Sequence, residues 1–380
     1  MMKNDKKTIG FILVIILAVV LGAFLGSKIT INKIDNNVNK TNDDFYELSS
    51  YANPNDKQIE IEVPDQEIKY EMIDSHLHYL DFLQTSDGFG PLIDAMDKSG
   101  VKSAIIFGMP MAKQWDETMK VAPTYYLSND SRCYYYPATD YLLAEELLAQ
   151  PKEVQDRFYP FICGVNTNDR FAKDHIKQAL EMYPDFWCGI GEIMSRHDDL
   201  TALTYGEAPH INSQTFKDIF DLGAEYDLPV LVHHNITGQN VDDVLYLDEL
   251  KEALAYNRNC KIIWAHMGIS RRVNVKDLAE IVDDLLKNNN NLYVDISWVV
   301  YDYYFLGDFP DNYAHSDPFD EWVDLVNKYP DRIMIGTDKV GHWQTYPQEI
   351  FKYYTLLDKL DEEVVNKICR DNVLTILKKK

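Results

Sequence analysis

The sequence predicts an α/β protein, a (β/α)8 TIM barrel, preceded by one N-terminal transmembrane helix. Short apolar runs alternate with longer amphipathic stretches, and the alternation occurs eight times between about residues 70 and 340. Eight βα units over that length match the size and order of such a barrel. An open doubly wound sheet is the alternative, but no glycine-rich phosphate loop follows the first apolar run.

A separate apolar run near the N-terminus predicts the membrane helix. Residues 8–26 contain no charged side chain, and Lys3, Lys6 and Lys7 precede them. As a helix the run would be about 28 Å long, close to the thickness of a bilayer. It exceeds the apolar core of a signal peptide and lacks a small-residue cleavage site, so we expect an anchor rather than the alternative, a cleaved signal peptide. The lysines place residues 1–7 in the cytoplasm and the rest of this single-pass cell-membrane protein outside it.

The segment after the anchor differs in composition from both of its neighbours. Residues 27–66 are mostly polar and rich in Asn, Asp, Lys and Ser, which predicts a tether. Within it, residues 59–63 alternate in the manner of a short strand. We expect the barrel domain to cover residues 67–380.

The barrel strands are predicted from length and residue type. Eight runs qualify, at 70–73, 103–107, 158–165, 186–191, 229–232, 261–265, 292–296 and 332–336. Amphipathic stretches predict helices between them, including 172–182, 213–226, 241–257, 275–287 and 319–328. Two more helices are expected after the eighth strand, at 347–359 and 361–377.

Charge and cysteine content exclude several classes of function. The formal net charge is −24, and an acidic surface repels phosphate backbones, so nucleic acid is not an expected partner. The five cysteines are scattered and form no CxxC pair, which favours small core residues over a disulfide framework or a zinc ribbon.

Histidines and carboxylates at the predicted strand ends carry the chemistry. His76 and His78 follow the first strand, where residues two apart point to the same face. Neutral imidazole is a common metal ligand, but with ten histidines in the chain this pair alone is weak evidence. Four further candidates end the fourth, fifth, sixth and eighth strands: Glu192, His233, His266 and Asp338. Barrel active sites lie at these strand ends, so one site would collect all six.

Other residues near the strand ends carry weaker expectations. Alternation points His234 out of the barrel, and Asp74 either caps the strand end or orients a ligand, with no metal role. Arg196 and His197 either touch substrate or face solvent. A last group either walls a substrate pocket or packs elsewhere: Trp298, Tyr301, Tyr303, Tyr304, His342 and Trp343.

Taken as a set, these motifs resemble a known superfamily. The segments Asp74-x-His76-x-His78, Ile263-x-x-His266-x-Gly268 and Gly336-Thr337-Asp338, with a closing region around Asn372, resemble the metal-dependent amidohydrolase superfamily. The resemblance covers about residues 70–377. It is greatest to the amidohydrolase-related branch that also holds the aminocarboxymuconate-semialdehyde decarboxylase-type enzymes.

The resemblance implies residue roles. His76, His78 and His233 would ligate one metal, with Asp338 beside it. His266 would support that site or handle a proton, or would ligate a second metal. Glu192 resembles the carboxylate that bridges two metals in the deoxyribonuclease branch, whereas the related decarboxylases do not generally use that position so. One ion and two ions therefore both remain open.

The residue types suit these roles. Imidazoles and one carboxylate leave an open coordination position, where a metal lowers the pKa of bound water. Asp338 would take the proton of that water, and His266 would donate a hydrogen bond to the developing oxyanion. Glu192 would bind the metal or orient a histidine. Zinc is the first expectation for the divalent ion, with manganese or iron as alternatives.

We therefore expect a metal-dependent hydrolase, of enzyme class 3, that cleaves an amide, ester or lactone bond of a small molecule. A metal-dependent non-oxidative decarboxylase is the alternative in chemistry. A barrel that has lost catalysis and serves as a binding protein is the alternative from another class. A homodimer is expected only by analogy with relatives.

Overall fold

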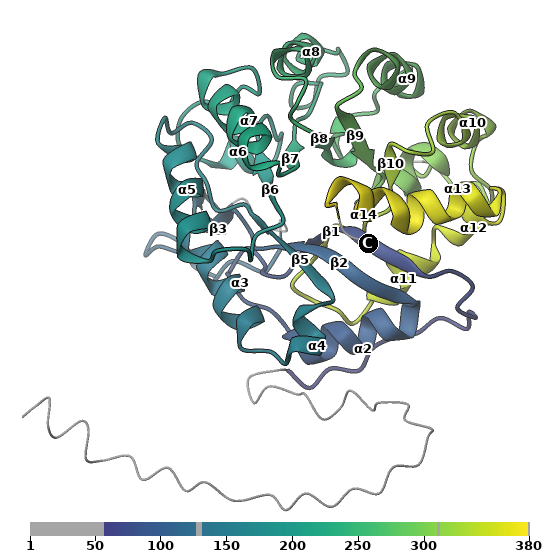
Figure 1. The fold of residues 1–380 in the computed structure, drawn as a ribbon, viewed down its shortest axis with the longest axis horizontal. Coiled ribbons are helices and arrows are strands. Elements are labelled where there is room, and N and C mark those ends of the chain that lie inside the picture. Colours follow the sequence, from purple (N-terminus) through teal and green to yellow (C-terminus); the bar gives the residue numbers. More distant parts are fainter. Residues whose placement is uncertain (1–56, 127–130, 310–311, 379–380) are drawn as a thin grey trace, which may run out of the picture. The chain divides into compact units, whose positions relative to one another are not determined.

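The computed structural model describes residues 57–126, 131–309 and 312–378. In this part of the chain a parallel sheet is surrounded by helices (Figure 1). The predicted parallel α/β fold is confirmed. Seven strands are continuous: β1 (Met72–His78), β2 (Val101–Phe107), β5 (Phe158–Ile162), β6 (Gly189–Met194), β7 (Val230–His233), β8 (Ile262–Trp264) and β9 (Leu292–Asp295).

The eighth strand position closes the sheet into a ring. It consists of two short strands, β10 (Ile333–Met334) and β11 (Lys339–Val340). β10 pairs in parallel with β9, and β11 pairs in parallel with β1, the other end of the sheet. Between them Ser75 N–H donates to Ile335 O at 2.9 Å, and Asp338 N–H donates to His76 O at 2.8 Å. The residues of the gap are therefore held against β1.

Apolar side chains from the strands fill the barrel interior. They form one buried cluster with two residues of the last helix: Ile73, Ile105, Phe107, Phe161, Cys163, Leu231, Ile263, Ala265, Met334, Val373 and Ile376. The side-chain amide of Asn372 donates to Pro330 O and to Ile333 O, both at 2.7 Å, which ties α14 (Asn372–Ile376) to the start of β10. Since α14 closes the end of the barrel at which the strands begin, the opposite end carries the polar side chains.

The helices lie outside the sheet (Figure 1). Those that follow the first seven strand positions are α2 (Phe89–Ser99), α3 (Ala138–Leu148), α4 (Lys152–Gln155), α5 (Ala172–Met182), α6 (Leu200–Leu203), α7 (Gln214–Tyr226), α8 (Leu247–Tyr256), α9 (Leu278–Asn288) and α10 (Asp320–Lys328). The eighth is followed by α11 (Tyr346–Phe351), α12 (Tyr354–Leu357), α13 (Glu362–Asn366) and α14. Ser213 caps α7, because its side chain accepts a hydrogen bond from Phe216 N–H.

Several predicted boundaries are wrong. The fourth strand is β6, not 186–191, because Phe186 and Trp187 pack beside α5, where the Trp187 indole donates to Ala179 O at 3.0 Å. The helix predicted at 241–257 begins only at Leu247. The stretch predicted as one helix at 347–359 is divided into α11 and α12, and 361–377 is interrupted by a π turn at Lys367–Asp371.

Two segments at the edges of the barrel also differ from expectation. The alternating stretch 59–63 is not a strand, although Ile61 is buried in the main core. An antiparallel pair that the apolar pattern did not indicate, β3 (Met111–Lys113) and β4 (Cys133–Tyr135), follows β2.

The N-terminal predictions fall on a part of the chain that is not described. The predicted cytoplasmic segment 1–7, the anchor 8–26 and most of the tether 27–66 lie outside the described residues. Within residues 57–126, 131–309 and 312–378, no helix has the length and apolar character needed to cross a membrane.

Candidate metal centre

Glu192, on β6, lies at the centre of the polar end of the barrel. Its Oε2 is 3.2 Å from Nε2 of His78 and 3.7 Å from Nε2 of His76. Its Oε1 is 3.1 Å from Nδ1 of His233 and 3.2 Å from Nε2 of His266. One buried carboxylate therefore stands between two pairs of imidazoles, with one oxygen facing each pair.

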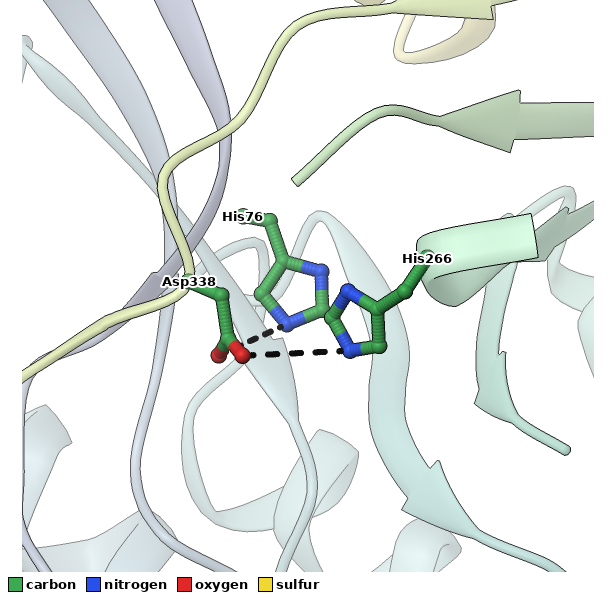
Figure 2. Close-up of side chains that lie close together, drawn as sticks. All are labelled: His76, His266 and Asp338. Atoms are coloured by element: carbon green, nitrogen blue, oxygen red, sulfur yellow. Dashed lines mark ion pairs between the residues drawn. The ribbon is translucent and has the colours of Figure 1, made fainter. Parts of the chain in front are cut away.

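Asp338 completes the group from the gap in the eighth strand. Its Oδ1 lies 3.4 Å from Nε2 of His78. Oδ1 also lies 3.5 Å from Nε2 of His76, and Oδ2 lies 3.9 Å from Nε2 of His266 (Figure 2). Its backbone is in the left-handed region, with φ of 54°, a conformation that is uncommon outside glycine. The Asp338 side chain is 13% exposed, whereas the surrounding rings are 0–3% exposed, so Asp338 is the acidic group of the centre most open to solvent.

The first pair of rings is fixed by hydrogen bonds on its outer nitrogens. His76 Nδ1 lies 3.1 Å from Oδ2 of Asp295, and His78 Nδ1 lies 2.7 Å from the carbonyl oxygen of Gly108. A carboxylate and a carbonyl only accept hydrogen bonds, so each Nδ1 is the donor. In a neutral ring Nε2 then carries a lone pair, and in both rings this atom faces Glu192.

The outer nitrogens of the second pair, His233 and His266, are fixed by hydrogen bonds in the same way. His233 Nε2 donates to Oδ1 of Asn235 at 2.5 Å, which leaves the Nδ1 lone pair toward Glu192. His266 Nδ1 lies 2.6 Å from Oγ of Ser297, and the Ser297 hydroxyl donates to Asp295. The serine oxygen must accept from His266, so Nε2 of His266 carries its lone pair inward.

Four inward lone pairs around a carboxylate are repulsive unless cations lie between them. The Nε2 atom of His76 is also buried without a hydrogen-bond partner among the described residues, which is costly for a polar atom. Imidazole nitrogens with carboxylate or carbonyl partners on their outer side are the arrangement that metal-binding histidines adopt. The residues present therefore fit divalent metal ions.

The electrostatics favour positive charge at this place. Burial lowers the pKa of His76, but the carboxylates of Asp295 and Glu192 overcome this and hold the pKa well above its ordinary value. Burial raises the pKa of Glu192, and the surrounding histidines, His76 foremost, hold that pKa well below its ordinary value.

A cavity opens beside the centre, and its empty space is about 360 Å³ with the open mouth included. Beside the metal-site side chains, its walls are mostly apolar: Phe82, Met109, Tyr126, Met194, Leu200, Trp298 and Val340. His197 also lines it and stacks on His233, with ring centroids 4.1 Å apart. Burial, together with the charge of His233, holds the pKa of His197 well below its ordinary value, so this ring is neutral.

Asp74 and His234 do not join the centre. Asp74 accepts hydrogen bonds from His76 N–H at 3.0 Å, from the Thr337 hydroxyl at 2.6 Å and from the Tyr346 hydroxyl at 2.9 Å, and so ties β1 to the eighth strand. Burial raises the pKa of Asp74 to about 6. The ring nitrogens of His234 lie 3.0 Å from Ser195 Oγ and 3.1 Å from Tyr246 O, away from Glu192.

The remaining expected pocket residues are divided between surface, core and cavity. Arg196 pairs with Glu249 at 2.7 Å and is not in contact with the metal centre. Trp298 lines the cavity, whereas Tyr301, Tyr304 and Trp343 are buried in the main core and Tyr303 packs against it. His342 lies between two carboxylates, 3.1 Å from Asp81 and 3.0 Å from Asp87.

Sequence reasoning missed the residues that support the ring nitrogens. Asp295 contacts His76 and accepts hydrogen bonds from His266 N–H at 3.0 Å and from the Ser297 hydroxyl, so one buried carboxylate orients both pairs of rings. Its signal was a lone acid within the apolar run 292–296. Asn235, two residues after His233, carried no signal by itself.

Together the fold and the site define a barrel protein with a cluster of histidines and carboxylates that fits divalent metal ions. The family model described as amidohydrolase matches residues 73–378, so the chain belongs to the amidohydrolase family. No curated protein matches it.

Several solved structures share the fold. An uncharacterized TIM-barrel protein from Bordetella bronchiseptica has a TM-score of 0.51 at 12% identity, over 81% of this chain and 99% of that chain. A 2,6-dihydroxybenzoate decarboxylase complexed with 2,6-dihydroxybenzoate has a TM-score of 0.50 at 14% identity, over 82% and 99%. A dihydroorotase from Campylobacter jejuni has a TM-score of 0.50 at 16% identity, over 82% and 84%. At these identities the likeness concerns the fold alone.

Proposed function

We propose that this chain is a metal-dependent hydrolase that acts on a small molecule through two divalent ions. The observation that carries the proposal is the position of Glu192, whose two oxygens face different pairs of histidines. Two ligand groups share it: His76, His78 and Glu192, and Glu192, His233 and His266, with ligand atoms within 4.8 Å of one another in each. Asp338 adds an oxygen beside the first group. Zinc is the first candidate, with manganese or iron as alternatives.

The cleaved bond is proposed to be an amide, ester or lactone. Divalent ions bound here would supply a water of lowered pKa and would polarise a carbonyl oxygen. Asp338 accepts the proton of the attacking water, because it is the acidic group of the centre most open to solvent. A new C–O bond forms, the bond to the leaving group breaks, and Asp338 returns the proton to the leaving atom. His266 acts in this scheme as a ligand, since its inner nitrogen carries a lone pair rather than a hydrogen.

The wall of the cavity favours decarboxylation as a second candidate. Phe82, Tyr126 and Trp298 offer aromatic surface suited to a planar ring. In that reaction the C–C bond to a substrate carboxylate breaks, carbon dioxide leaves, and the ring carbon takes a proton from Asp338.

Product analysis separates the two reactions. The zinc-loaded full chain is incubated with a panel of amides, esters, lactones and hydroxybenzoates, and products are followed by mass spectrometry and by carbon dioxide release. We expect products heavier than the substrate by one water, or their two cleaved parts, without carbon dioxide. Release of carbon dioxide from a hydroxybenzoate would favour the second candidate, and metal binding without any turnover would favour a binding protein.

A further inference from the structure

A second cavity lies beside the metal centre, between the loops that follow β6 and β7. Its empty space is about 590 Å³ with the open mouth included. It is lined by Arg196, His197 and Asp198 from the first loop and by Asn235, Thr237 and neighbours from the second. His197 lines both this cavity and that of the metal centre. The two cavities therefore meet at the His197 side chain, and a molecule bound at the metal centre would lie next to the second cavity.

Three residues of the second cavity carry buried polar atoms that have no hydrogen-bond partner within the described part of the chain. The atoms are Nδ2 of Asn235, Oγ1 of Thr237 and Oδ1 of Asp198, on residues that are 1%, 2% and 7% exposed. Three such atoms along one cavity are unusual, because an unsatisfied buried polar atom costs about 1 to 3 kcal/mol.

The orientation of two of these side chains is fixed by their other atoms. Asn235 Oδ1 accepts from His233, and Asp198 Oδ2 accepts from the Ser270 hydroxyl. Asn235 therefore presents a donor to whatever fills the space around Nδ2, and Asp198 presents an acceptor. Thr237 can do either.

The charge of the cavity disfavours an anion. Arg196 is the one arginine among the described residues that line it. The Glu249 carboxylate accepts hydrogen bonds from Nε of Arg196 at 2.9 Å and from Nη2 at 2.7 Å. The Arg196 guanidinium also stacks on the Tyr246 ring, 3.6 Å from its centroid. Asp198, by contrast, keeps one carboxylate oxygen without a hydrogen bond from the described residues, and its charge would repel a carboxylate or phosphate.

We propose that this second cavity binds a neutral carboxamide or ureido group of the substrate. Such a group carries a carbonyl oxygen for Asn235 Nδ2 and an N–H for Asp198 Oδ1, with Thr237 as a further partner. The inference rests on the proposed function, since it takes the occupant to be part of the molecule that reaches the metal centre. Asn235 holds His233 with its other atom, so the occupant is fixed one side chain away from a metal ligand.

The experiment uses benzamide and benzoate as probes, because they differ only in the group at issue. Saturation-transfer NMR measures their dissociation constants for the metal-free full chain, so that neither probe can bind through an ion. We expect benzamide to bind at least about tenfold more tightly than benzoate. Thr237→Val should weaken benzamide roughly three- to tenfold, and Asp198→Asn should reduce the preference for benzamide by admitting benzoate.

Thr215→Val is the matched control, because Thr215 is a buried threonine of α7 and does not line this cavity. It should bind both probes as the wild type does, and circular dichroism checks the fold of each variant. Equal binding of the two probes, no binding of benzamide, or no effect of Thr237→Val and Asp198→Asn would overturn the assignment. Metal content is measured separately, so a chain that selects benzamide but takes up no metal would refute the proposed function while leaving this site in place.

Discussion

Among single residues, Asp338 differs from its neighbours in being partly open to the cavity while contacting two histidines. Asn at this position keeps the shape and one acceptor oxygen but cannot accept the proton. We predict that Asp338→Asn lowers kcat by about 10²- to 10⁴-fold, with the histidine and glutamate ligands still retaining metal. Turnover and metal content of the same preparation check this. A variant with wild-type kcat would remove Asp338 from the chemistry.

Substitutions of Asp295 test whether the hydrogen bonds on the outer ring nitrogens organise the centre. It contacts His76, His266 and Ser297, and a partner of this kind typically changes metal affinity 10- to 100-fold. We predict about tenfold weaker metal binding for Asp295→Asn and about hundredfold for Asp295→Ala, by competition with a chromophoric chelator. Asp331→Asn, at an exposed acid paired with Lys367, is the control and should leave the affinity unchanged. Equal affinity in all variants would show that Asp295 has a packing role only.

The strand-end histidines were predictable as single residues because alternation in a strand and the layout of barrels are general rules. The fit of these residues to a metal ion was not predictable from the sequence. It depends on Gly108, Asn235 and Asp295, which lie far from their partners in sequence or carry no pattern, and which decide where each ring keeps its hydrogen. Residues such as Tyr301 and Tyr304 show the opposite problem, since aromatic residues after a strand look alike whether they line a cavity or pack in the core.

At the scale of elements, the loops after β1 and β11 are joined by one histidine. His342 lies between Asp81 and Asp87; burial lowers its pKa, but the two carboxylates raise it to about 9. A pKa raised above the unfolded value of about 6.5 stabilises the fold fully below pH 6.5, and this contribution is lost as pH rises through about 9. We predict that His342→Gln lowers the free energy of unfolding by about 1 to 2 kcal/mol at pH 6, which is the pKa shift discounted for partial exposure, and by far less at pH 10.

Urea denaturation of the wild type and of His342→Gln at both pH values measures this difference. His315→Gln is a suitable control, because His315 is exposed and packs on Phe319 without a carboxylate partner among its described ion pairs. The same loss of stability for His342→Gln at pH 6 and pH 10 would contradict the role given to the two carboxylates.

Elements were predicted well where one periodicity dominates and poorly where tertiary contacts decide. The helix at Ala172–Met182 has the predicted bounds. The strand predicted at 186–191 lies instead at Gly189–Met194, as β6, because Phe186 and Trp187 pack beside α5. No local sequence pattern indicates that contact. The β3–β4 pair is short and lies in a loop, so apolar runs gave no signal for it.

At the scale of the whole molecule, the net charge of −24 and the apolar run at residues 8–26 bear on the location of the protein in the cell. We propose that residues 8–26 anchor the chain in the cell membrane with the barrel outside the cytoplasm. The full chain should stay with membranes after an alkaline carbonate wash, and protease added outside intact spheroplasts should digest the barrel. Release by the wash, or protection from the protease, would contradict the anchor or its orientation respectively.

The centre with two ions is the claim on which the other proposals depend, and metal content tests it most directly. Plasma mass spectrometry is applied to the purified full chain, to Glu192→Gln and to Glu249→Gln, the last a control at a glutamate that pairs with Arg196 away from the centre. We predict about two equivalents of a divalent transition metal in the wild type and in Glu249→Gln, and fewer than one in Glu192→Gln. No metal in the wild type after reloading with zinc or manganese, or equal metal in all three, would contradict the account.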